Sequence, residues 1–363
     1  MAPPQDLRQL TALRFVAALW VVLYLFWPRL AVSDTPALIA HGYLGVELFF
    51  ILSGFILSHV YGDEVRSGAF RYLRFLGARI ARIYPLHLAT LAGMGLLVAA
   101  AAIVGVEADP SILSWASLPA NLLLMQAWGL APVAGWNHPS WSVSAEWFAY
   151  LTFPLFMSVM LPGARRPFTT LALTVAFMFG VYAGFERLSG EPLTSATISW
   201  GALRIVPCFA YGCALHILWR AHPGGPAGSE VWLAAAAALC VVILASLDVH
   251  DSVIILGEGA LIYALARLAN SQSQAFGNHA AVYLGEISYA VYMVCAPCQI
   301  VFVNTAARLL EVNHESLPIW PWILCLVLII PVAAAAHHLI EKPARAQIRG
   351  WTDSWSTQRR TVA

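Results

Sequence analysis

The chain has 363 residues, of which 60% are hydrophobic and only 11% are charged, and its mean hydropathy is +0.72. Soluble globular domains carry about 25% charged residues, so this composition excludes a soluble protein and indicates an all-α polytopic membrane protein. Spans of roughly 20 residues allow about ten transmembrane helices and leave no room for a separate soluble domain. The net charge of +1 does not indicate a nucleic-acid partner, because the basic residues follow the membrane topology and form no single patch.

Ten apolar runs predict the spans. The first lacks the small-residue cleavage site of a signal peptide, so we expect it to be retained. The segment 63–85 carries five arginines and is therefore expected to be a cytoplasmic loop, which also places both termini in the cytoplasm. The predicted helices cover about 10–27, 42–61, 85–105, 142–161, 167–186, 198–219, 231–247, 252–268, 280–305 and 319–341.

The segment 112–128 is apolar but is interrupted by Pro119, Asn121 and Gln126. If it crossed the membrane, every later loop would invert and the arginine-rich tail would lie outside, against the positive-inside rule. We therefore expect an excursion at the outer face, either re-entrant or lying at the interface. The chain is then one transmembrane domain, 1–345, followed by a cytoplasmic tail, 346–363.

Charged side chains within the spans are costly and are usually kept for function. Arg14 and position 25 are eleven residues apart, three helical turns or roughly 16 Å along one face. Glu47 and Glu146 enter their helices from the outer side at a depth similar to that of Leu25, so one outer cavity could collect all three. Each carboxyl could instead make a buried structural hydrogen bond. Arg204 is a candidate counter-charge for a glutamate further along the chain, Glu258 or Glu286.

Arg79 and Arg82 lie at i and i+3 before the third predicted helix. Two guanidiniums at this spacing can grip phosphates through charge-assisted hydrogen bonds. They can also anchor the helix to anionic lipid headgroups, and the spacing by itself favours the anchor.

The sequence resembles the membrane acyltransferase 3 family, which O-acylates cell-envelope and exported polysaccharides. Six motifs in the same order carry the resemblance, and together they cover nearly the whole chain. They are Leu10–Ala18, Gly42–Phe55, Arg79–His87, Trp141–Tyr150, Leu284–Tyr292 and His338–Pro343.

The resemblance implies a ten-helix protein of the bacterial cytoplasmic membrane, with an acyl-coenzyme A donor on the cytoplasmic side and no metal. It makes Arg79, Arg82 and His87 the expected contacts to the donor, acetyl-coenzyme A being the donor we expect. Arg14 becomes half of a catalytic arginine and histidine pair, which Glu47 would help to orient. We assign the glycan acceptor to an outer site of Trp136, His138, Trp141 and Glu146, since aromatic rings stack on sugars; His138 could equally be a solvated histidine.

Two positions depart from the family pattern. Leu25 stands where the family has the histidine expected to act as general base, and Cys295 stands where a histidine is common. Leucine cannot accept a proton, and loss of a positioned base costs about 100- to 10,000-fold in rate. The chain is then an engineered variant, a natural pseudoenzyme that binds glycan or donor, or an enzyme with another base, Glu47 or His41. A glycan or lipid transporter or flippase is the alternative from a different class.

Overall fold

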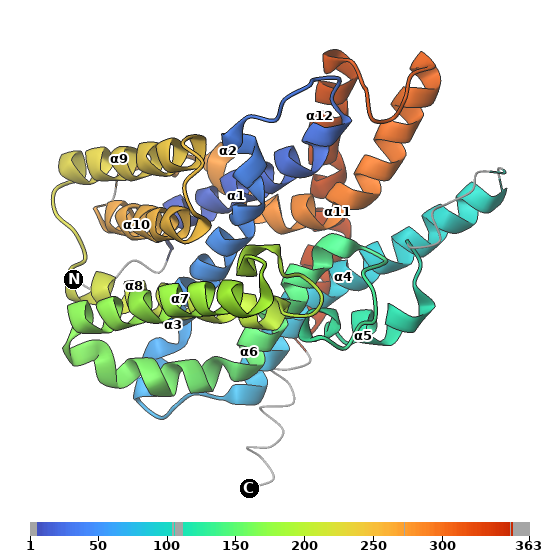
Figure 1. Ribbon diagram of the computed structural model, residues 1–363. Coiled ribbons are helices and arrows are strands. Elements are labelled where there is room, and N and C mark those ends of the chain that lie inside the picture. The colour runs from blue at the N-terminus through green and yellow to red at the C-terminus, as the bar shows by residue number, and fades with distance from the viewer. Residues whose placement is uncertain (1–5, 104, 106–111, 272, 349, 351–363) are drawn as a thin grey trace, which may run out of the picture.

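The computed structural model describes residues 6–103, 105, 112–271, 273–348 and 350. These residues form helices and no sheet, and ten helical segments among them are long and apolar enough to cross a membrane. The protein is therefore an all-α polytopic membrane protein, as predicted (Figure 1). The long helices are α1 (Arg8–Phe26), α3 (Gly45–Arg66), α4 (Tyr72–Ile103), α6 (Trp141–Met160), α7 (Pro167–Ser189), α8 (Gly201–Ala221), α9 (Ala227–Ser246), α10 (Asp251–Asn270), α11 (His279–Leu310) and α12 (Ile319–Ala336); α2 (Ala37–Ala40) and α5 (Leu118–Leu122) are single turns.

The largest difference from the prediction is the start of α4. The sequence placed a loop at 63–85 and took Pro85 as the start of the helix, whereas α4 begins at Tyr72 and continues through Pro85. Arg79 and Arg82 are therefore part of α4, in agreement with the prediction that they share one helix face. Hydropathy did not indicate that α4 begins at Tyr72, because the first turns of a long helix need not be apolar.

The segment 112–128 forms no spanning helix. Its described residues make the 3-10 turn Trp115–Ser117, the short α5 and a second 3-10 turn, Gln126–Trp128. Side chains tie the segment to the start of α6: Trp128 Nε1 donates to the Ser144 carbonyl at 3.0 Å, and Ser144 Oγ donates to the Leu124 carbonyl at 2.8 Å.

The centre of the molecule is the crossing of α3 and α8, its most extensive helix pair. Gly54 and Gly212 allow this close approach. A Cβ on Gly54 would lie 2.1 Å from the Phe209 carbonyl oxygen, and a Cβ on Gly212 would lie 2.0 Å from the Ile51 carbonyl oxygen. Small residues at such crossings are typical of membrane helices, which gain contact by approaching closely.

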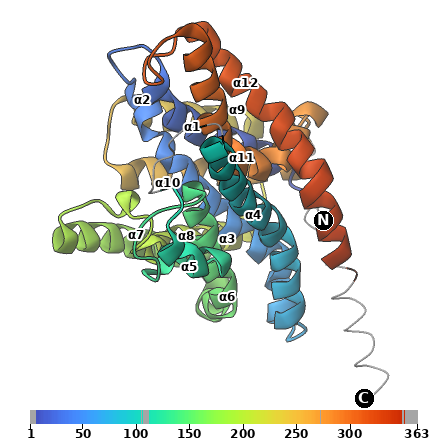
Figure 2. The same ribbon diagram turned by 90° about the vertical axis from the view of Figure 1, so that its right-hand side faces the viewer.

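α11 packs against both α1 and α12. Figure 2 shows α4, α11 and α12 on one side of the molecule, away from α7.

The two ends of the helix bundle differ in charge. One end, which we call the arginine-rich end, carries Arg66, Arg71, Arg74, Arg165, Arg166 and Arg220 at or beside the termini of α3, α4, α6, α7 and α8. Ion pairs join its elements, such as Arg220 Nη1 with Asp63 Oδ1 at 2.6 Å. The cytoplasmic location of this end stays a prediction, and of the predicted tail, residues 349 and 351–363 lie outside the described part of the chain.

Candidate functional site

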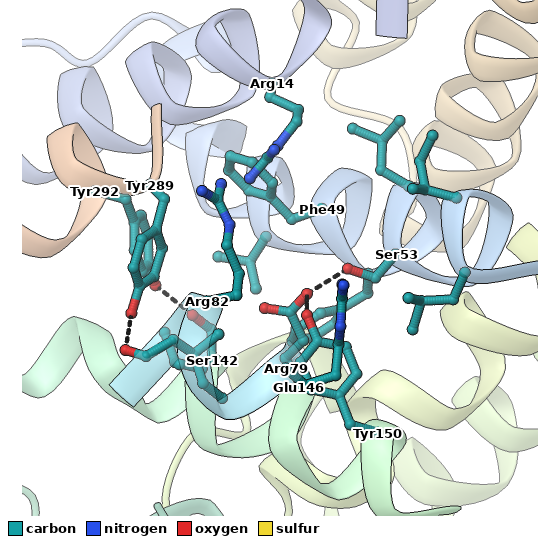
Figure 3. Close-up of a pocket in the computed structure, with 17 residues that line it drawn as sticks. Arg14, Phe49, Ser53, Arg79, Arg82, Ser142, Glu146, Tyr150, Tyr289 and Tyr292 are labelled. Carbon is teal, nitrogen blue, oxygen red and sulfur yellow. Dashed lines mark hydrogen bonds between the residues drawn. The ribbon is translucent and has the colours of Figure 1, made fainter. Parts of the chain in front are cut away.

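A buried cationic pocket lies between α1, α3, α4, α6 and α11, toward the arginine-rich end (Figure 3). We call it the arginine pocket. Its cavity has a volume of about 130 Å³, enough for several waters or a phosphate-sized group. Three of its lining residues are arginines, Arg14, Arg79 and Arg82, whereas one is a carboxylate, Glu146. The pocket thus brings together four residues that the sequence had singled out, from three different motifs.

Arg79 is held by aromatic rings. Its guanidinium carbon lies 5.7 to 5.9 Å from the ring centroids of Tyr61, Phe75 and Tyr150, within the range of cation–π attraction. Its Nη2 donates to the Tyr61 hydroxyl at 3.4 Å, and its buried Nε has no hydrogen-bond partner among the described residues. The rings hold the guanidinium in place without neutralising it.

Arg82 is held by one ring and one carboxylate. Its guanidinium carbon lies 5.4 Å from the Tyr289 ring centroid, and its Nη1 donates to Glu341. The buried Nη2 has no partner in the described part of the chain. A buried N–H without an acceptor is costly, so both arginines retain donors that an anion in the pocket would satisfy.

Glu341 reaches Arg82 because the chain forms a π-helical turn, His337–Glu341, after α12. This carboxylate is completely buried and also accepts from Arg345 and contacts His337 Nδ1 at 3.0 Å. π-turns often occur at functional sites. Sequence analysis placed Glu341 in a motif but predicted no contact with Arg82.

Glu146 accepts two hydrogen bonds inside the pocket, from Ser53 Oγ of α3 and from the Tyr150 hydroxyl, both at 2.5 Å. On the α11 side, Ser142 Oγ donates to the Tyr292 hydroxyl at 2.8 Å, and that hydroxyl donates to the Pro139 carbonyl at 2.8 Å. Sequence reasoning did not single out these hydroxyls, although Ser53 and Tyr292 lie in two of the motifs.

Glu47 lies outside this pocket. Both of its carboxylate oxygens accept from Arg204, with Arg204 Nη2 to Glu47 Oε2 at 2.9 Å, and both side chains are buried. The guanidinium also lies 4.7 Å from the Trp141 ring centroid and donates to the Ala196 carbonyl at 3.0 Å. Glu47 is the counter-charge of Arg204, which agrees with the buried structural role left open for this carboxyl, and Arg204 pairs with Glu47 and not with Glu258 or Glu286. The role of Glu47 toward position 25 stays a prediction.

Leu25 also lies outside the pocket, near the opposite end of α1 from Arg14. Its carbonyl accepts from Gln299 Nε2 of α11 at 2.6 Å, and its half-buried side chain packs against the core. The two positions therefore belong to one helix but not to one cavity.

His87 does not accompany Arg79 and Arg82. It is completely buried, and its Nε2 lies 2.7 Å from the Asn121 carbonyl oxygen, which fastens the segment around α5 to α4. His87 is not among the residues that line the arginine pocket, and its assignment to the donor site stays a prediction.

The four residues of the predicted acceptor site do not all line the arginine pocket. Trp136 packs edge-on against Trp115 and donates to the Ser114 carbonyl, His138 is exposed, and Trp141 lies against Arg204. Glu146 alone of the four lines the arginine pocket, together with Ser142 one helical turn earlier on α6. Glu47, which we expected to share a cavity with Glu146, does not line this pocket.

The fold and the pocket define a class: an integral membrane protein with a concentrated positive charge buried among its helices. The particular family follows from comparison. Residues 7–338 match the acyltransferase 3 family, described as an acyltransferase domain, and the chain belongs to this family.

Two of three similar proteins are named as an acyltransferase or an acetyltransferase. The chain is 31% identical over 324 residues to "Acyltransferase MdmB" of Streptomyces mycarofaciens, covering 80% of the chain and 79% of that protein. It is 21% identical over 336 residues to "Peptidoglycan O-acetyltransferase OatA" of Listeria monocytogenes, covering 84% of the chain and 51% of that protein. It is also 42% identical over 93 residues to "Protein 2 in picA locus" of Rhizobium radiobacter, covering 26% of the chain and 46% of that protein. No solved structure matches the chain.

Proposed function

We propose that this acyltransferase is an O-acyltransferase of the bacterial cytoplasmic membrane that uses acyl-coenzyme A as donor and a glycan hydroxyl as acceptor. The observation that supports it is the arginine pocket, which three half-buried arginines and one carboxylate line, and where two of the arginines have a buried donor without a partner among the described residues. A ligand rich in phosphate oxygens meets this demand, and the donor carries a diphosphate.

In this proposal Arg79 and Arg82 bind the phosphates of the donor, and Arg14 adds positive charge from α1. The cavity of about 130 Å³ holds a phosphate-sized part of the donor and not the whole molecule. Coenzyme A carries its thioester at the end of a long arm, so the acyl group would react at a distance from the phosphates. Position 25 is roughly 16 Å along α1 from Arg14, which is the distance that such an arm would have to span in this proposal.

The reaction needs a base. The acceptor hydroxyl attacks the thioester carbonyl, its proton passes to the base, and the thiolate of coenzyme A leaves. In the parent enzyme we assign the base to a histidine at position 25. With Leu25 we expect a rate about 100- to 10,000-fold lower. Of the two other candidate bases, Glu47 is disfavoured because it is paired with Arg204. His41 stays an alternative, with its Nε2 3.5 Å from Asp248 Oδ1 and 3.8 Å from Asp251 Oδ1.

The acceptor is proposed from a relative. The name of the OatA protein refers to a peptidoglycan, a glycan outside the cytoplasmic membrane, and to acetyl transfer. We extend both to this chain as an acetyl donor and an exopolysaccharide or lipid-linked glycan acceptor.

Two measurements test the function. Coenzyme A should raise the unfolding temperature of the purified protein, and this shift should be lost in Arg79→Ala while the matched variant Arg71→Ala, at an exposed position of the same end, keeps it. A Leu25→His variant should gain acyl transfer to a glycan acceptor. If coenzyme A produces no shift in any variant, the donor is wrong and a transporter becomes the better hypothesis; a shift without gained transfer rejects only the base.

A further inference from the structure

A second cationic hollow lies at the arginine-rich end, between the ends of α3, α6 and α8. It has a volume of about 280 Å³ and is lined by Arg66, Arg165, Arg220 and His216, among others. Asp63 pairs with two of these arginines through the same oxygen, at 2.6 Å from Arg220 and 3.4 Å from Arg66. One carboxylate is therefore paired with two of the three lining arginines, and the hollow has a net positive charge.

His216 is a further polar residue that lines the hollow. Its side chain is buried, its ring packs between Phe55, His59 and Trp219, and its Nε2 has no hydrogen-bond partner among the described residues. An unsatisfied buried donor or acceptor costs free energy, so a polar ligand beside it is favoured.

An apolar groove continues from this hollow along α8. It has a volume of about 520 Å³ and lies between α6, α7 and α8, where Phe148, Leu155, Phe156, Leu173, Phe177 and Val206 line it. Met160 lines both the hollow and the groove. On α8, Val206 and Ala210 face the groove, and Cys213, Ile217 and Arg220 face the hollow, so the two sites follow one another on one helical face.

The groove presents an apolar surface to a ligand, although three threonines line it. Thr152 donates to the Phe148 carbonyl, Thr170 to the Gly163 carbonyl and Thr174 to the Thr170 carbonyl, each at 2.8 Å. Their hydroxyls are thus satisfied by the backbone. A hydrocarbon chain would meet no unpaired hydroxyl from these residues.

We propose that the hollow and the groove together bind one anionic phospholipid, with its phosphate among Arg66, Arg165 and Arg220 and an acyl chain in the groove. A free phosphate would use the hollow alone and would leave the adjoining groove unexplained. The nucleotide of the donor is disfavoured because it has no hydrocarbon chain to fill the apolar groove. The site is independent of the proposed donor, since it shares no lining residue with the arginine pocket.

The test is native mass spectrometry of the full chain, delipidated in detergent and titrated with phosphatidylglycerol, phosphatidylcholine or glycerol 3-phosphate. We expect phosphatidylglycerol to bind at least tenfold more tightly than the other two. Arg66→Gln/Arg165→Gln should weaken it about tenfold, because two charge-assisted contacts are lost. Val206→Phe, which fills the groove, should weaken it as well.

The matched control is Arg71→Gln/Arg166→Gln, which removes two exposed arginines of the same end that do not line the hollow. This variant should bind phosphatidylglycerol normally. Equal losses in both double variants would show only general charge attraction and reject the site. Normal binding in Val206→Phe, or glycerol 3-phosphate binding as tightly as the lipid, would reject the chain in the groove. If Arg66→Gln/Arg165→Gln weakens coenzyme A binding and not lipid binding, the hollow belongs to the donor.

Discussion

Two regions of this molecule bury arginine in different ways. At the Arg204 region, both Glu47 oxygens, the Ala196 carbonyl and the Trp141 ring surround one guanidinium, and the pair is closed. In the arginine pocket, three guanidiniums face Glu146 across a cavity, and Nε of Arg79 and Nη2 of Arg82 have no partner among the described residues.

The difference separates architecture from binding. A buried charge must be compensated, and a compensated pair has nothing left to offer to a ligand. The Arg204 region therefore holds α3 to α8, whereas the arginine pocket keeps positive charge and donors available. An intramembrane arginine is thus informative only together with its partners.

The largest expected effect is a loss of stability when the Glu47–Arg204 pair is broken. Glu47→Gln leaves Arg204 buried without its counter-charge and should lower the free energy of unfolding by about 3–5 kcal/mol. Thermal unfolding in detergent measures it, with the exposed Glu64→Gln as control. Glu47→Gln/Arg204→Met should recover part of the loss; if the double variant is less stable than the single one, the two residues do not act as a pair.

The next effect is on the open pocket. Arg79→Gln or Arg82→Gln should weaken coenzyme A binding about 10- to 100-fold, because each charge-assisted hydrogen bond contributes about 1.5–3 kcal/mol. Neither should approach the stability loss of Glu47→Gln. Calorimetric titration beside thermal unfolding separates the two quantities, and unchanged affinity in both variants would remove the pocket from the donor site.

A smaller effect on coenzyme A binding is expected at Glu341. This positioning residue accepts a hydrogen bond from Arg82 and so pairs one side of an arginine that otherwise lines the arginine pocket. Glu341→Gln should weaken coenzyme A binding about tenfold, since Arg82 loses the carboxylate that aims it. Glu341→Asp should restore part of the affinity. A loss of stability with normal affinity would assign Glu341 to the fold alone.

The smallest effect is expected at Ser53. Ser53→Ala removes one hydrogen bond to Glu146 and should change coenzyme A affinity by about fivefold or less, corresponding to about 1 kcal/mol. The Ser142→Ala variant, which removes a lining hydroxyl that bonds to Tyr292 and not to Glu146, serves for comparison. A change above 50-fold in Ser53→Ala would show that Glu146 itself contacts the ligand.

The sequence was sufficient for the helices because hydropathy is local. All ten predicted spans are present, and the family motifs pointed to Arg14, Arg79, Arg82 and Glu146 before any geometry was known. The partners were not predictable in the same way. Arg204 and Glu47 are 157 positions apart, and Arg82 and Glu341 are 259 apart, so no spacing rule connects them.

By itself the sequence determined that this is a ten-helix membrane acyltransferase and that position 25 holds a leucine, because composition, hydropathy and motif order reside in the chain. The tertiary structure decided which arginines are fully paired and which retain donors without a partner among the described residues. Glu47 pairs with Arg204, Glu341 contacts Arg82 from a π-helical turn, and Leu25 lies outside the arginine pocket. Long-range packing makes these choices, since the cost of a buried charge depends on what the fold places beside it.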